Sequence, residues 1–114
     1  MRQARLKSEL WIQAHIRRCQ SAGAFCVVAR RGDADAGAIA VRIYLARDEI
    51  RLLMQSMDFE GNAVWRDVFG GPVAQSRVDE RLEKEARYDP DMWVIEIEGC
   101  DGAAYLEIAP QDPD

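Results

Sequence analysis

The sequence has few of the residues from which catalytic and metal sites are usually built. Its 114 residues include a single histidine, His15, and three cysteines, which form no CxxC pair. An odd number of cysteines would leave one thiol outside any disulfide framework, so we expect reduced thiols and a cytoplasmic protein. A Cys₃His zinc site would need His15, Cys19, Cys26 and Cys100 together. Because no zinc-like spacing joins them, we predict no metal site and a buried, hydrogen-bonded histidine.

Long apolar runs and nucleotide-binding motifs are also missing. No stretch approaches the roughly 18 apolar residues of a membrane span, and no apolar segment of a secretory signal follows the charged N-terminal residues. The segment Gly70-Gly71-Pro72 lacks the lysine and the helix start of a phosphate-binding loop. We therefore expect a protein outside the membrane that holds no cofactor.

The residues that are present have the composition of an ordinary folded protein. Apolar residues make up 48% of the chain and charged residues 31%, which is typical of globular proteins. A chain of 114 residues has the common size of one domain. We predict a single domain over residues 1–109 and a disordered acidic tail over residues 110–114.

Charge is distributed unevenly along the chain. Residues 1–31 hold seven basic residues and one acidic residue, whereas residues 77–114 hold four basic and twelve acidic residues. A basic segment in an acidic protein often marks a contact with an anionic partner, although the two ends could also neutralise each other within the fold. The predicted interaction surface consists of Arg5, Lys7, Arg17 and Arg18. Its partner would be another protein or a second copy of the chain, as in a homodimer.

Hydrophobic periodicity predicts a helix followed by four strands. The helix is expected at residues 9–22, with Ser8 as its N-cap. Its buried face would carry Trp11, Ile12, His15, Ile16 and Cys19. Apolar or alternating segments predict strands near residues 25–29, 39–45, 50–54 and 64–69. The short turns between these strands favour an antiparallel meander.

A second helix and two further strands complete the predicted order. Ser76 and Asp79 resemble a capping box for a helix that ends before Asp89-Pro90. Alternation then predicts a strand at residues 93–98, with Glu96 and Glu98 facing solvent, and a short strand at residues 104–108. The order α-β-β-β-β-α-β-β predicts an α+β fold, a mostly antiparallel sheet with two helices packed on one face.

The loop between the first two strands is a candidate ligand site. Arg30 and Arg31 precede a glycine-containing turn, where guanidinium groups and backbone N–H groups could hold a phosphate or carboxylate. Asp33 and Asp35 could instead pair with these arginines and make a self-contained structural turn. A ligand-binding protein or an enzyme that uses this loop is therefore an alternative function.

Two further binding modes follow from the charged residues. Carboxylates that could hold a cation gather near the second predicted helix stop: Asp89, Asp91, Glu96, Glu98 and Asp101. Their spacing matches no EF-hand loop, and the two glutamates are expected to face solvent. The basic N-terminal helix could contact nucleic acid, but a pI near 4.9 is unusual for such proteins.

Three segments together resemble a known family. They are Arg5-Leu6-Lys7-Ser8-Glu9-Leu10-Trp11 with Arg17-Arg18, Arg30-Arg31-Gly32-Asp33-Ala34-Asp35-Ala36-Gly37, and Asp89-Pro90-Asp91-Met92-Trp93-Val94-Ile95-Glu96. Their order and spacing resemble the alphaproteobacterial family called domain of unknown function 1491, over about residues 5–98. The resemblance implies a small bacterial domain without an assigned activity, and it supplies no catalytic residues. We predict a non-catalytic binding or adaptor protein.

Overall fold

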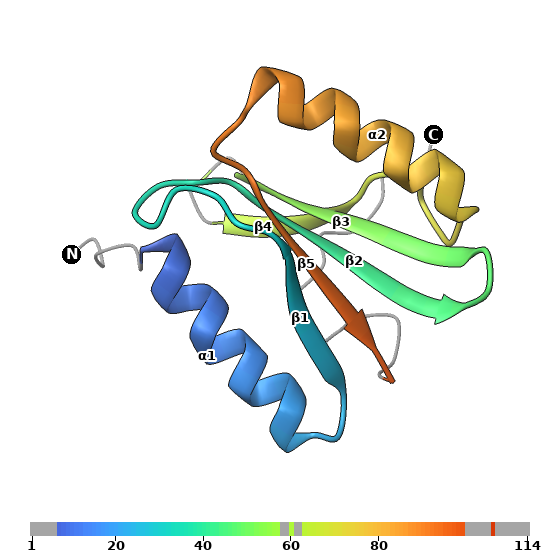
Figure 1. The fold of residues 1–114 in the computed structure, drawn as a ribbon, viewed down its shortest axis with the longest axis horizontal. Helices are drawn as coiled ribbons and strands as arrows, with labels where there is room; N and C mark the ends of the chain where they lie inside the picture. The colour runs from blue at the N-terminus through green and yellow to red at the C-terminus, as the bar shows by residue number, and fades with distance from the viewer. Residues whose placement is uncertain (1–6, 58–59, 61–62, 100–105, 107–114) are drawn as a thin grey trace.

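The computed structural model describes residues 7–57, 60, 63–99 and 106. These residues form helix α1, strands β1 to β4, helix α2 and strand β5 (Figure 1). The elements are α1 (Ser8–Ser21), β1 (Phe25–Arg30), β2 (Ile39–Ala46), β3 (Glu49–Met57), β4 (Ala63–Asp67), α2 (Gln75–Tyr88) and β5 (Trp93–Glu98). This order confirms the predicted α+β class. The strand expected at residues 104–108 lies, apart from Leu106, outside the described residues.

The five strands form one sheet in the order β1-β5-β2-β3-β4. The antiparallel meander is confirmed for β2, β3 and β4, but β1 and β2 are not neighbours as the short connection suggested. Strand β5 lies between them, antiparallel to β1 and parallel to β2. Its central position explains why Val94 and Ile95 are both buried although they face opposite sides. The prediction that Glu96 and Glu98 face solvent is confirmed for Glu98, whereas Glu96 is half-buried and Val94, on the same face, is buried.

The two helices cover opposite faces of the sheet, so the prediction that both pack on one face was wrong (Figure 1). Ile12 and Cys19 of α1 pack with Val41 and Ile95 on one face of the sheet. On the other face, Val78 and Leu82 of α2 pack with Ala40, Leu52 and Val94. The central strands are apolar on both faces, and each face needs its own cover.

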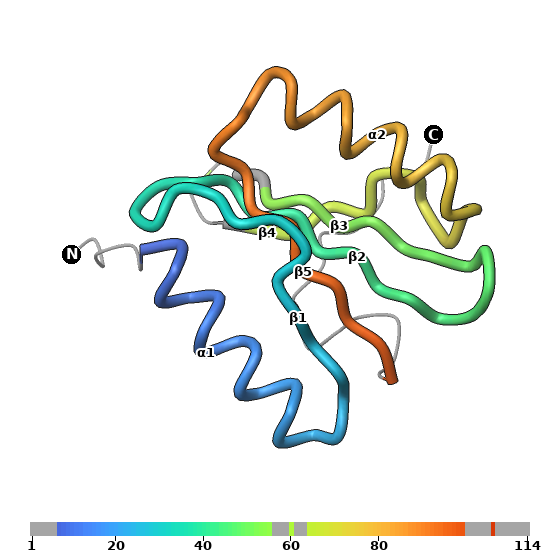
Figure 2. The backbone as a smooth tube through the Cα atoms, in the orientation of Figure 1, coloured from blue at the N-terminus to red at the C-terminus, as the bar shows by residue number. Residues whose placement is uncertain are grey.

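Both helices begin without the side-chain caps that the sequence suggested. Lys7 is the N-cap of α1, and Ser8 is its first residue, with its hydroxyl donating to the Gly37 carbonyl at 2.6 Å. The N–H of Glu9 donates to the Ala34 carbonyl at 3.0 Å, so the loop after β1 caps α1 with its backbone. Figure 2 shows this loop returning to the start of the helix.

Helix α2 likewise starts after Ala74, which makes no side-chain cap bond. Asp79, the expected capping-box partner of Ser76, instead pairs with Arg42 of β2 at 2.7 Å. Arg42 also binds Glu96 of β5 at 2.8 Å, and this arginine therefore ties α2 to two strands.

Neither α1 nor α2 is long and apolar enough to span a membrane, and the described residues contain no other helix.

Candidate functional site

The clearest binding geometry lies on the exposed side of α2. Val78 and Leu82 are buried against the sheet, which fixes the direction in which the rest of the helix faces. Four residues, which we call the α2 stripe, share one solvent-facing side: Arg77, Arg81, Lys84 and Tyr88. At 100° per residue these side chains fall within an arc of about 60°. The helix therefore presents three cations and an aromatic ring in one row.

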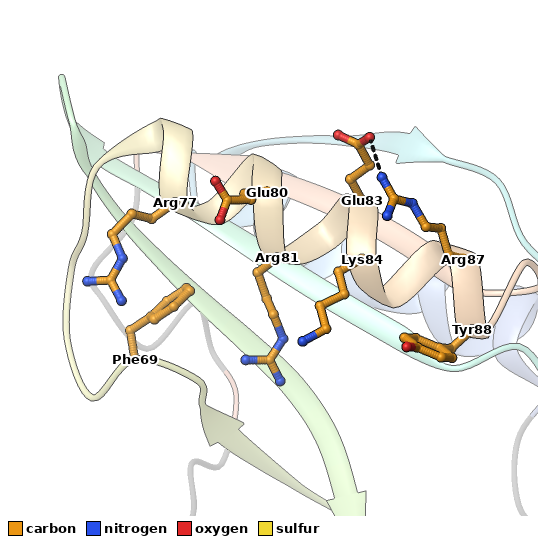
Figure 3. Close-up of a pocket in the computed structure, with 8 residues that line it drawn as sticks. All are labelled: Phe69, Arg77, Glu80, Arg81, Glu83, Lys84, Arg87 and Tyr88. Atoms are coloured by element: carbon orange, nitrogen blue, oxygen red, sulfur yellow. Dashed lines mark hydrogen bonds and ion pairs between the residues drawn. The ribbon is translucent and has the colours of Figure 1, made fainter.

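The α2 stripe lines a cavity of about 840 Å³, which we call the α2 pocket. Phe69, from the segment after β4, also lines this pocket. Figure 3 shows Arg81, Lys84 and Tyr88 projecting to the side of the helix on which Phe69 lies. Glu83 and Arg87 extend from the other side of the helix. The cavity has the size of small-ligand and peptide-anchor sites.

A buried aspartate fixes the position of Phe69. Asp67, at the end of β4, accepts hydrogen bonds from the N–H groups of Phe69, Gly70 and Gly71 at 3.3, 3.0 and 3.2 Å. Its other carboxylate oxygen accepts from Nε of Arg51 at 2.8 Å. The turn that results places the Phe69 ring 4.8 Å from the guanidinium carbon of Arg77, a cation–π contact.

The pocket is positively charged in a negatively charged protein. Four basic and two acidic residues line it, for a net charge of +2, while the whole chain carries −5. Arg81 donates from Nε to Glu85 at 2.8 Å, and Arg87 binds Glu83 at 3.1 Å on the exposed surface. Lys84 has no hydrogen-bond or ion-pair partner among the described residues. Tyr88 is 79% exposed.

A smaller cavity of about 450 Å³ lies on the other flank of α2. Its walls include Arg30 of β1, Arg42 of β2 and Arg87 of α2, and Leu82 and Val94 add apolar surface. The arginines are already engaged: Arg30 donates to backbone carbonyls, and the other two form ion pairs. This cavity therefore offers fewer free groups than the α2 pocket.

The predicted loop site is held together mainly by its own polar groups. Arg30 donates to the carbonyls of Met92 and Pro90 at 3.2 and 3.1 Å. Arg31 binds Glu9 of α1 at 2.6 Å and lies 5.4 Å from the Trp93 ring.

The aspartates of this loop also serve its own structure. The Asp33 carboxylate accepts from the N–H groups of Asp35 and Ala36 at 3.1 and 2.9 Å. The Asp33 carbonyl accepts from the indole N–H of Trp93 at 2.7 Å. The predicted pairing of Asp33 and Asp35 with the two arginines was wrong, because Asp33 accepts from backbone N–H groups and Asp35 lies beside Lys7. Ligand binding by this loop stays a prediction.

The predicted basic surface is only partly described. Arg5 lies outside the described residues, and Lys7 is 3.6 Å from the Asp35 carboxylate. Arg17 and Arg18 are exposed on α1, on the opposite side of the sheet from α2. The structure therefore places these residues apart from the α2 pocket.

His15 and the nearby cysteines form a buried, uncharged cluster. His15 stacks on Trp11 with ring centroids 4.7 Å apart, and its Nε2 lies 3.5 Å from the Cys19 sulfur. Burial lowers the pKa of His15, and the charge of Arg18 lowers it further. Burial raises the pKa of the Cys19 thiol, with smaller opposing effects from Cys26 and Arg18. Both groups are therefore uncharged near pH 7, so Cys19 is a thiol and not the thiolate that a nucleophile requires, and both side chains are buried away from solvent.

The proposed cation ligands do not come together among the residues described. The N–H of Asp91 donates to the Asp89 carboxylate at 3.2 Å, which makes a local turn. Glu96 binds Arg42, Glu98 is exposed at the end of β5, and Asp101 lies outside the described residues. No group of three or more potential metal ligands occurs in the described ranges, which also leave out Cys100.

The α2 stripe was missed because charge was counted along the sequence. Helix α2 contains four basic and four acidic residues, so its net charge is zero. The signal that could have revealed the stripe is the spacing Arg-x₃-Arg-x₂-Lys-x₃-Tyr, which places all four residues on one side of a helix.

Comparisons with other proteins place the chain in a family. Residues 6–107 match the sequence model of DUF1491, described as a protein of unknown function. A crystal structure of a DUF1491 family protein from Caulobacter crescentus is 35% identical, with a TM-score of 0.79, over 92% of this chain and 100% of that chain. A solution structure of a protein from A. tumefaciens is 32% identical, with a TM-score of 0.81, over 96% and 98% of the two chains. No match was found among curated proteins. The chain belongs to the DUF1491 family, whose function is unknown.

Proposed function

We propose that this protein is a non-catalytic, cytoplasmic binding domain that recognises an anionic partner at the α2 pocket. The observation that carries the proposal is the row of cationic side chains on the solvent-facing side of α2. Lys84 has no partner among the described residues, and only Nε of Arg81 is bonded. These cations lie beside the exposed ring of Tyr88. A cavity of this kind binds carboxylate or phosphate oxygens through charge-assisted hydrogen bonds.

The electrostatics of the whole chain support a local rather than a general attraction for anions. A protein with a net charge of −5 repels polyanions at long range. The pocket, with a net charge of +2, attracts an anion once it is within about one Debye length, roughly 8 Å at physiological salt. Binding should therefore be selective for short anionic groups.

The buried position of the only described thiol–imidazole contact supports a non-catalytic role. Cys19 is fully buried and His15 is 3% exposed, so a substrate could not reach them without opening the α1 face. The α2 pocket contains arginine, lysine, glutamate and aromatic side chains, which are suited to recognition.

The test titrates ¹⁵N-labelled protein with citrate and with tripolyphosphate and measures the amide chemical shifts at each step. We expect saturable shifts at Phe69 and across α2, with an apparent Kd of about 1 mM or lower. Lys84→Gln should weaken binding about five-fold, because one charge-assisted contact is lost. Arg17→Gln, which removes the same charge from α1, should leave the affinity unchanged.

Two outcomes would contradict the proposal. If both anions shift amides around Arg17 or within residues 30–37, binding occurs at one of the surfaces predicted from the sequence. If neither anion produces saturable shifts at 20 mM or so, the α2 pocket is not an anion site at any useful affinity.

A further inference from the structure

The geometry of the α2 stripe restricts which anionic partner can occupy it. The helix rises 1.5 Å per residue, so Arg77 and Arg81 are about 6 Å apart along the axis, and Arg81 and Lys84 about 4.5 Å. The whole stripe, from Arg77 to Tyr88, is roughly 16 Å long. An extended peptide places alternate side chains on one face about 6.7 Å apart. Two carboxylates at alternate positions therefore match the spacing along the helix axis of the residues that carry the first two cations.

The acidic residues that flank the stripe disfavour a densely charged chain. Glu80 and Glu83 line the same pocket, and Glu85 is bonded to Arg81. A nucleic acid backbone, with one charge on every phosphate, would bring several charges close to these glutamates. A peptide with two separated carboxylates would meet the cations and leave uncharged residues beside the glutamates.

The aromatic residues also fit a peptide better than bases. One aromatic ring lies near each end of the stripe: Phe69 at Arg77, and Tyr88 at the C-terminal end. The Phe69 ring is half-buried and the Arg77 guanidinium already lies over one of its faces, so it offers less surface for base stacking than an exposed ring. Both rings can still contact apolar side chains at their edges.

We infer that the α2 pocket binds an extended, acidic peptide segment of a partner protein, with two carboxylates at alternate positions flanked by apolar residues. This inference rests on the proposed function and specifies its ligand. The carboxylates contact the cations of the stripe, and the apolar side chains contact Phe69 and Tyr88. The peptide crosses the exposed side of α2 and adds no strand to the sheet.

The experiment compares two peptides of identical composition by amide shifts or calorimetry. The first is acetyl-Leu-Ser-Glu-Ser-Glu-Ser-Leu-amide, whose carboxylates share one face. The second is acetyl-Leu-Ser-Ser-Glu-Glu-Ser-Leu-amide, whose carboxylates point to opposite faces. We expect the first to bind at least about three-fold more tightly, because only its two carboxylates can contact adjacent cations together. An octathymidylate should bind more weakly than the first peptide.

Variants locate the site and test each part of it. Lys84→Gln and Arg81→Gln should each weaken binding of the first peptide about five-fold, and Tyr88→Ala about three-fold. Arg17→Gln on the opposite face should change it by less than about 1.5-fold. All four positions are at least partly exposed, so the variants should stay folded, and circular dichroism would check this.

The inference is overturned if the two peptides bind equally, or if the oligonucleotide binds more tightly. In either case, amide shifts on α2 caused by citrate would still support the proposed function. If citrate, tripolyphosphate and both peptides all leave α2 unchanged, the inference and the proposed function fail together.

Discussion

Asp67 offers the sharpest test of how the α2 pocket is built. Its side chain is 3% exposed, and it accepts three backbone N–H groups from the turn that carries Phe69. It also binds Arg51, whose side chain is 21% exposed. Removing one partner of such a buried pair typically costs about 3–5 kcal/mol, since the other charge is left without compensation. We therefore expect Asp67→Ala to lower the free energy of unfolding by about 3–4 kcal/mol.

The isosteric change separates shape from charge at this position. Asp67→Asn keeps one oxygen for the three N–H groups but turns an amide toward Arg51, so we expect a loss of about 2 kcal/mol. The matched control is Asp48→Asn. Asp48 is exposed, accepts a single bond from the Gln75 N–H at 3.3 Å, and has a φ of 56° that asparagine tolerates. We expect this control to change stability by less than about 0.5 kcal/mol.

Urea unfolding, followed by tryptophan fluorescence and circular dichroism, measures all three variants. A loss below about 1 kcal/mol for Asp67→Ala would refute the idea that this carboxylate organises the turn. An equal loss of unfolding free energy for the substitutions at residues 67 and 48 would show that burial and the number of hydrogen bonds do not set the contribution of the Asp67 carboxylate. If Asp67→Ala is folded, its affinity for citrate should also fall, because Phe69 is no longer held in place.

Two further predictions concern the α1 face and the loop after β1. Burial lowers the pKa of His15 below its ordinary value of 6.5, so the unfolded chain binds a proton that the folded chain does not. The contribution of neutral His15 to the free energy of unfolding is then fully present above pH 6.5 and is lost as the pH drops below it, by up to about 1.4 kcal/mol per pH unit. Urea unfolding at several pH values should show this slope, and His15→Gln should remove it. A Cβ on Gly32 would overlap the Asp91 carbonyl and lie 2.8 Å from Cδ1 of Trp93. We expect Gly32→Ala to lower the unfolding free energy by about 1–3 kcal/mol, and a change below about 0.5 kcal/mol would contradict this packing.

The sequence predicted the elements well because each one carries a local signal. The face of α1 with Ile12, His15 and Cys19 was expected from the helical period, and these three residues are buried. The apolar alternation that predicted β2 and β3, and the Asp89-Pro90 pair that predicted the end of α2, are also local signals. Such signals depend on neighbouring residues, which the sequence shows directly.

The sheet order could not be predicted because it depends on pairing between distant segments. Strand β5 inserts between β1 and β2, although the β1–β2 connection is short enough for a hairpin. Its apolar residues on both faces, Val94 and Ile95, were the available sign of a central strand. The neighbouring Glu96 hid that sign, because its charge is neutralised by Arg42, 54 residues away in the sequence. Because β5 was expected to expose one face to solvent, both helices were predicted to pack on the other face of the sheet.

The two candidate sites differ in whether their polar groups are satisfied within the fold. In the loop after β1, the Asp33 carboxylate, the Asp33 carbonyl and the Arg31 guanidinium all have partners inside the protein. An anion there would have to displace the Asp33 carboxylate from the N–H groups of Asp35 and Ala36 and compete with Glu9 for Arg31. On α2 the free amino group of Lys84 costs the folded state little, because it is exposed to water. An anion on α2 gains new bonds without breaking old ones, and this difference in free energy favours α2 as the site of function.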